Sequence, residues 1–209
     1  MGINLGSGFG NLTPNTNNNS PAGGILNLNK NDVLDLTKRN PGLKRVMLGA
    51  GWDLSNNGSD FDLDIAAFLL DANNKFNTVS NVIFFNNRVG QGIALAGDNR
   101  TGAGEGDDET INIELEKIDS NIQKIVFVVT IHEAMAKRQT FGMINNSYVR
   151  LVDLDQNGKE LCRFNLKENG STATSVIFAE LYRNGAEWQF KAVGEGKIAD
   201  LNGVLALYQ

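Results

Sequence analysis

The stretch Asp60-Phe61-Asp62-Leu63-Asp64-Ile65-Ala66-Ala67-Phe68-Leu69-Leu70 decides the fold. Its first half alternates acidic and apolar residues, and its second half is continuously apolar. Alternation with a period of two is typical of a strand with one buried face, and a short apolar run indicates a strand buried on both faces. The stretch therefore predicts a β-strand that turns Phe61, Leu63 and Ile65 toward the core.

Segments of the same character recur along the chain, and turn residues separate them. Asn157-Gly158 and Asn184-Gly185 are typical of hairpin turns, because both residue types tolerate a positive φ. One helix is predicted near His132–Arg138, where good helix formers cluster, and Leu201–Tyr208 fits either a helix or an edge strand. This pattern predicts a mainly β protein, an antiparallel β-sandwich of two sheets with one or two short helices. The other predicted strands are Ile25–Leu28, Val33–Leu36, Lys44–Gly51, Asn81–Phe85, Thr110–Leu115, Gln123–Ile131, Tyr148–Asp153, Glu160–Leu166, Ser175–Tyr182 and Glu187–Val193.

The composition is that of a globular domain with a polar N-terminal segment. The chain has 209 residues, of which 41% are hydrophobic and 21% charged, which is close to ordinary globular usage. Residues 6–24 are rich in Asn, Gly, Ser and Pro and hold too few large apolar side chains to offset the entropy of ordering them. We therefore expect a flexible segment at 1–24 and a sandwich domain at 25–209.

Charge and hydropathy exclude several classes of protein. The net charge is −5, the pI is about 4.9, and no run of Lys or Arg appears, so a nucleic-acid partner is not expected. The longest apolar runs, such as Ile125–Val129, are far shorter than a membrane-spanning helix requires. The single cysteine, Cys162, permits no intrachain disulfide and fits a strand residue. We expect a cytoplasmic protein.

Acidic side chains are aligned on the predicted strand 60–64. Asp60, Asp62 and Asp64 share one face, with neighbours roughly 7 Å apart at two-residue strand spacing. Such carboxylates repel one another, and protonation, basic partners or a bound cation relieves the repulsion.

A second acidic segment interleaves oxygen-bearing side chains with glycines, Gly97-Asp98-Asn99-Arg100-Thr101-Gly102-Ala103-Gly104-Glu105-Gly106-Asp107-Asp108-Glu109. Calcium takes six to eight oxygen ligands, and glycines let a loop aim its carbonyls inward. Neither Cys nor His occurs here, which argues against zinc, and so many oxygens suit calcium better than magnesium. The alternative is a solvated acidic loop with Arg100 as a partial counter-charge.

Three functional readings follow from these two segments. The first is a calcium-binding, non-enzymatic interaction module. The second is a sandwich that binds a membrane or a carbohydrate through calcium, and the third is a metal-dependent hydrolase. The only histidine, His132, is not near the acidic segments in sequence, which counts against the hydrolase. An EF-hand-like start at Asp153-Leu154-Asp155-Gln156-Asn157-Gly158 lacks the glutamate at its twelfth position and is interpreted as a hairpin turn.

Several motifs together resemble the TerD family of tellurite-resistance and general-stress proteins, over roughly Ile25 to the C-terminus. The resemblance implies a two-sheet β-sandwich with calcium in acidic loops at one end and no established catalytic activity. It also implies partners among other stress and tellurite-resistance proteins, some of them membrane-associated, which would place the chain at the inner face of the membrane. The motifs are Val46-Met47-Leu48-Gly49-Ala50-Gly51-Trp52-Asp53, Asp60–Asp64, Gly97–Gly102, Gly106–Glu109, Val128–His132, Arg138–Gly142 and Glu187–Gly194.

Carried over residue by residue, the resemblance implies a ligand set large enough for two calcium ions. Carboxylate and amide ligands would come from both acidic segments, and backbone carbonyls from the second. Arg100 would brace the loop. The implied ligands are Asp60, Asp62, Asp64, Asp98, Asn99, Thr101, Gly102, Gly104, Asp107, Asp108 and Glu109.

Overall fold

The computed structural model describes residues 24–53, 61–96, 106–166 and 172–209. The strands are β1 Leu26–Leu28, β2 Val33–Asp35, β3 Arg45–Asp53, β4 Leu63–Leu70, β5 Val82–Ile83, β6 Val89–Gly90, β7 Ile93–Ala96, β8 Glu109–Glu114, β9 Lys124–Ile131, β10 Asn145–Asp153, β11 Lys159–Asn165, β12 Ser175–Asn184 and β13 Glu187–Lys197. The helices are α1 Leu36–Arg39, α2 Ala134–Lys137 and α3 Leu201–Leu205, with 3-10 turns at Val79–Asn81, Leu115–Lys117, Phe141–Met143 and Ala206–Tyr208.

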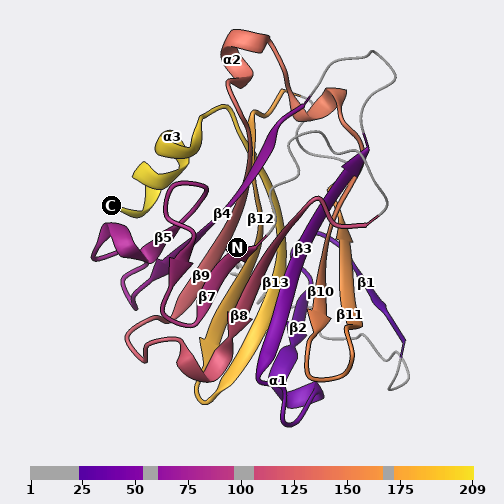
Figure 1. Ribbon diagram of the computed structural model, residues 1–209, viewed down its shortest axis with the longest axis vertical. Coiled ribbons are helices and arrows are strands. Elements are labelled where there is room, and N and C mark those ends of the chain that lie inside the picture. Colours follow the sequence, from indigo (N-terminus) through magenta and orange to yellow (C-terminus); the bar gives the residue numbers. More distant parts are fainter. Residues whose placement is uncertain (1–23, 54–60, 97–105, 167–171) are drawn as a thin grey trace, which may run out of the picture.

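The strands form two sheets that face each other (Figure 1). A seven-stranded sheet has the order β1-β11-β10-β3-β8-β7-β6, and a six-stranded sheet has the order β2-β13-β12-β9-β4-β5. The pairs are antiparallel except for β1, which runs parallel to β11. The predicted fold class, an antiparallel-dominated sandwich with few short helices, is confirmed.

The main core fills the space between the sheets. Phe127 of β9 and Phe178 of β12 are fully buried, and their rings stack with centroids 6.1 Å apart. The predicted alternation at the start of β4 is confirmed, because Phe61, Leu63 and Ile65 are buried and the aspartates between them are partly exposed.

The second half of β4 is buried on both faces, as its apolar run predicts. Ala66, Phe68 and Leu70 belong to a smaller cluster on the outer face of the six-stranded sheet. Val204 of α3 joins this cluster, and α3 covers that face in Figure 1. The C-terminal segment is therefore a helix and not an edge strand. Asp200 caps it by accepting a hydrogen bond from the Gly203 N–H at 2.8 Å.

The predicted helix at 132–138 was too long. Two residues within the predicted range, Glu133 (φ 56°) and Arg138 (φ 53°), are in the left-handed region, which a right-handed helix cannot contain. Only α2, Ala134–Lys137, remains helical. Tertiary context overrides the helix propensity of these residues.

Other boundaries also differ from the predictions. The strand at 33–36 ends at Asp35, where α1 begins, and the strand at 81–85 shrinks to β5. β6 and β7 were not predicted, because a two-residue strand and a four-residue strand beside Gly90 and Gly92 give little periodicity.

Both predicted hairpins are confirmed, but the second turn lies at Gly185 and Ala186, because Asn184 still pairs with Glu187. Asn157 and Gly158 have φ values of 54° and 77°, and Gly185 has 63°. Asp153, which is 1% exposed, accepts hydrogen bonds from the backbone N–H groups of Asp155 and Gln156. The EF-hand-like start is therefore a turn between β10 and β11.

Cys162 lies in β11 and is buried, as predicted. Burial raises the pKa of its thiol to about 12, so the residue behaves as a small core hydrophobe. In the described part of the chain, no helix is long and apolar enough to cross a membrane. The segment predicted to be flexible, 1–24, lies outside the described residues except for Gly24.

Candidate metal-binding end of the sandwich

Both acidic segments lead into strands at one end of the sandwich. β3 ends at Asp53, and β4 and β8 begin with Leu63 and Glu109, at the end where α2 lies (Figure 1). The Asp108 N–H donates to the Ala50 carbonyl at 2.8 Å, which joins β8 to β3. The Asp62 carbonyl accepts the His132 N–H at 2.8 Å, which joins the approach to β4 to the end of β9. This end is called the loop end below.

Glu109 ties the two sheets together at the loop end. Its side chain is turned inward and is 4% exposed, and Oε2 accepts a hydrogen bond from the backbone N–H of Ile65 at 2.6 Å. β5 pairs with β4 only at Ala67 and Phe68, so the Ile65 N–H lies beyond that ladder. The carboxylate satisfies this buried donor and brings the second acidic segment beside the first.

The structure describes five of the predicted ligands. The other six, namely Asp60, Asp98, Asn99, Thr101, Gly102 and Gly104, lie outside the described residues. Within residues 24–53, 61–96, 106–166 and 172–209, no three side chains of the His, Cys, Asp and Glu type are grouped as a metal ion requires. The described acidic side chains alone therefore do not form a calcium site at this end. The described five are Asp62, Asp64, Asp107, Asp108 and Glu109.

Asp62 and Asp64 lie on the outer side of β4, opposite the buried Leu63. Asp64 Oδ2 is 3.6 Å from His132 Nδ1, and its side chain is 17% exposed. Asp64 and His132 also line a pocket of about 650 Å³ that lies against α2 and the start of α3. Solvent therefore has access to this side of the loop end.

Asp108 extends the β8 ladder with its side chain. It is 7% exposed, and Oδ2 accepts the backbone N–H of Trp52 at 2.9 Å. This bond continues the pairing of β3 with β8 beyond Ala50 and Glu109, the last residues in register. Asp108 thus fixes the end of β3.

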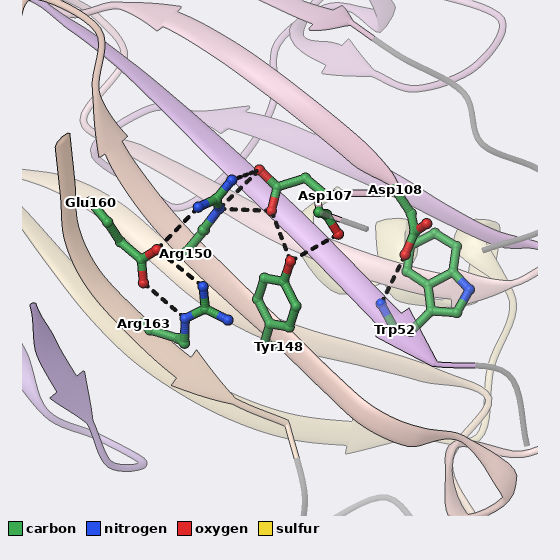
Figure 2. A network of polar contacts seen from close by, with 8 residues as sticks. Trp52, Asp107, Asp108, Tyr148, Arg150, Glu160 and Arg163 are labelled. Atoms are coloured by element: carbon green, nitrogen blue, oxygen red, sulfur yellow. Dashed lines mark hydrogen bonds and ion pairs between the residues drawn. The ribbon is translucent and has the colours of Figure 1, made fainter. Parts of the chain in front are cut away.

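Asp107 lies on the outer face of the seven-stranded sheet, where Arg150 of β10 holds it (Figure 2). Arg150 Nε donates to Oδ1 at 2.8 Å and to Oδ2 at 3.0 Å, and Nη2 donates to Oδ2 at 2.9 Å. The Tyr148 hydroxyl lies 3.2 Å from Oδ1 and donates to the Gly106 carbonyl at 2.9 Å. The Asp107 side chain is only 5% exposed.

A second acid and a second arginine complete this network. Glu160 accepts from Arg150 Nη1 at 3.1 Å and from Arg163 Nε at 2.8 Å. The Arg163 guanidinium lies over the Tyr148 ring, 4.1 Å from its centroid. Figure 2 shows the resulting chain of contacts across β10 and β11. Its two carboxylates and two guanidinium groups leave no net charge.

The network shifts the pKa of its members. The hydrogen bond to Asp107 is the main reason that the Arg150 pKa is raised. Burial works to raise the Glu160 pKa, but the bonds from Arg163 and Arg150 outweigh it and hold that pKa below its usual value. Burial, followed by the charge of Asp107, raises the Tyr148 pKa. At neutral pH, Arg150 and Glu160 are therefore charged and Tyr148 is neutral.

Two glycines of β3 make room for the network. A Cβ on Gly51 would lie 2.6 Å from Cζ and Oη of Tyr148. A Cβ on Gly49 would lie 2.7 Å from Asp107 Oδ1 and closer still to the other atoms of that carboxylate. Both glycines lie on the outer face of β3, because they alternate with the buried Leu48, Ala50 and Trp52. The side chains of Asp107 and Tyr148 therefore pack directly against the β3 backbone.

Sequence reasoning missed the other four side chains of the network around Asp107, which are Tyr148, Arg150, Glu160 and Arg163. They lie about forty or more residues away along the chain, and no local pattern links them. One signal was present: Gly49 and Gly51 occupy alternate positions of a predicted strand, which marks a place where other groups approach the backbone closely.

Comparison with known proteins gives one consistent family. The sequence model of the TerD domain matches residues 25–208. The chain is 46% identical over 186 residues to tellurium resistance protein TerD of Serratia marcescens, covering 88% of this chain and 96% of the relative. It is also 46% identical to general stress protein 16U of Bacillus subtilis, covering 82% of this chain and 90% of the relative.

A solved structure agrees with these relatives. It is a homologue of telluride resistance protein TerD from Streptomyces coelicolor A3(2), which matches with a TM-score of 0.65 and 28% sequence identity. The match covers 78% of this chain and 96% of that chain. The chain therefore belongs to the TerD family of tellurium-resistance and general-stress proteins.

Proposed function

We propose that this chain binds calcium at the loop end and acts as a non-catalytic interaction module of the stress and tellurite response. The observation that carries the proposal is the bond from the Ile65 N–H to Glu109 at 2.6 Å. It brings the two acidic segments together where β4 and β8 begin. Without a cation, the acids that both segments carry would repel one another at this end.

The chemistry of the donors suits calcium. Asp62 and Asp64 present hard carboxylate oxygens on a side of β4 that solvent reaches. The rest of the shell would come from both acidic segments, and two ions would share it. When bound, the ions would supply positive charge that cancels the repulsion and orders the loop end. Beyond the described Asp62 and Asp64, the ligands from these segments are Asp60, Asp98 and Asn99 and the carbonyls of Thr101, Gly102 and Gly104.

An interaction role fits the way the described acids are used. Asp108 and Glu109 accept hydrogen bonds from backbone N–H groups of β3 and β4, so they order the chain. A calcium-ordered loop end would then present a defined surface to a partner. We expect this partner to be another stress-response or tellurite-resistance protein, in the cytoplasm or at the inner face of the membrane, and not a nucleic acid.

Calcium is expected to raise the melting temperature of the chain, because an ion that binds only the native state stabilises it. Free calcium at about ten times its Kd contributes about 1.4 kcal/mol per site, or roughly 3–6 °C for a chain of this size. Differential scanning fluorimetry in calcium, magnesium or chelator measures the shift. Asp62→Asn should reduce it, and Asp155→Asn, which alters a carboxylate at the opposite end of β3, should not.

Two outcomes would contradict this proposal. Equal melting curves in calcium and chelator would exclude a calcium site that stabilises the fold. Calcium-dependent co-sedimentation with liposomes of anionic lipid would favour a membrane-binding sandwich over a protein-binding module.

A further inference from the structure

The carboxylates of Asp107, Asp108 and Glu109 are held in three different places. Asp107 lies on the outer face of the seven-stranded sheet against Arg150, and Asp108 bonds to the end of β3. Glu109 points between the sheets and bonds to β4. Three consecutive side chains that each bond to a different strand fix the chain that carries them. They are poorly placed to surround one ion.

Both carboxylate oxygens of Asp107 are bonded to Arg150. Oδ1 receives Arg150 Nε at 2.8 Å and faces the Tyr148 hydroxyl at 3.2 Å, while Oδ2 receives both Nε and Nη2 of Arg150. Each oxygen therefore already faces a positively charged donor, and the guanidinium covers the side of the carboxylate from which an ion would approach. The adjacent guanidinium would also repel a divalent cation.

Arg150 is itself held from the far side. Glu160 accepts from Nη1, and Arg163 then bonds to both oxygens of Glu160, with Nε at 2.8 Å and Nη2 at 3.0 Å. The Arg150 side chain is 27% exposed and that of Glu160 is 10% exposed. A planar guanidinium bonded on two sides has little rotational freedom, so Arg150 presents a fixed fork to Asp107.

We propose that Asp107, Asp108 and Glu109 anchor the C-terminal end of the acidic segment and are not calcium ligands, and that Arg150 is the residue that positions this anchor. The inference rests on the calcium binding proposed above. It removes Asp107, Asp108 and Glu109 from the ligand set and assigns them to the anchor. Because the anchor holds the start of β8 in place before an ion binds, less of the loop end has to be ordered on binding, so the anchor raises calcium affinity.

Titration calorimetry on folded protein, well below the melting temperature, tests the division. Asp107→Asn should bind the same number of calcium ions as the wild type. Arg150→Gln should keep that number but bind calcium roughly 10-fold more weakly, the cost of ordering about one more residue on binding. Arg45→Gln is the matched control, because Arg45 makes its ion pair, with Asp155, at the other end of β3. It should bind calcium as the wild type does.

Loss of one ion in folded Asp107→Asn would overturn the inference, because it would make Asp107 a ligand. An unchanged calcium affinity in Arg150→Gln would also overturn it. Arg150→Lys should fall between the wild type and Arg150→Gln, since an ammonium keeps the charge but not the two-pronged bond.

If the wild type binds no calcium, the proposed function is refuted but the anchor is not. Hydrogen exchange in calcium-free buffer then tests the anchor by itself. The Asp108 amide donates to the Ala50 carbonyl, and Glu109 pairs with Ala50 in the β3–β8 ladder. Both amides should exchange faster in Arg150→Gln than in the wild type or Arg45→Gln. Equal exchange in all three proteins would overturn the anchor.

Discussion

Gly49→Ala is expected to destabilise the protein by about 3 kcal/mol, although it adds a single methyl group. The new Cβ would occupy the place of the Asp107 carboxylate, which must then leave Arg150. Forcing extra atoms into a tight site costs about 1–3 kcal/mol, and separating a largely buried ion pair costs about 3–5 kcal/mol. Alanine also restricts the unfolded chain, which offsets roughly 0.5–1 kcal/mol of the destabilisation. Because Arg150 is partly exposed, separating the ion pair costs less than it would in a fully buried site.

Urea unfolding followed by tryptophan fluorescence measures this change, and a double mutant identifies its cause. In an Asp107→Ala background the obstructing carboxylate is gone, so adding Gly49→Ala should cost less than about 1 kcal/mol. Neighbouring substitutions couple in this way only when they share one interaction. The same loss in both backgrounds would show that Asp107 is not what Gly49 accommodates.

Glu109→Ala is expected to cost about 3 kcal/mol, because Glu109 is the buried link between the two sheets at the loop end. Its removal leaves the buried Ile65 N–H without its carboxylate acceptor, which costs about 1–3 kcal/mol, and the lost methylene groups add about 0.8 kcal/mol each. Glu109→Gln retains a carbonyl oxygen as acceptor and should cost about half as much.

Glu114→Ala provides the control for this prediction. Glu114 lies on the same strand, but its side chain faces outward and is 46% exposed. Its replacement should change the free energy of unfolding by less than about 0.5 kcal/mol, as surface substitutions usually do. If Glu109→Ala were no more harmful than Glu114→Ala in calcium-free buffer, Glu109 would not be the link between the sheets.

Local patterns in the sequence predicted the parts of the fold that local physics governs. The alternation of Phe61, Leu63 and Ile65 with aspartates gave the face of β4, and Asn157-Gly158 gave the β10–β11 hairpin. Both signals operate over a few residues. The helix at 132–138 failed for the opposite reason: its neighbours place Glu133 and Arg138 in the left-handed region against their own preference.

Long-range pairing explains most of what the sequence did not predict. The parallel pairing of β1 with β11 joins segments more than 130 residues apart, and no period in either segment specifies the partner. The same holds for Asp107, whose acidic neighbours made a ligand the natural interpretation. Only the fold reveals that Arg150 lies beside it. Acidic residues in one run can therefore differ in role, and the strands that face them decide which role each takes.

Native mass spectrometry of the full chain, after exchange into calcium and separately into magnesium, tests the proposed calcium binding most directly. We expect two calcium ions on the folded wild-type chain, the same two on Asp107→Asn, and fewer on a variant that replaces both Asp62 and Asp64 by Asn. A folded wild-type chain that carries no calcium, or that carries magnesium equally well, would contradict a calcium site at the loop end.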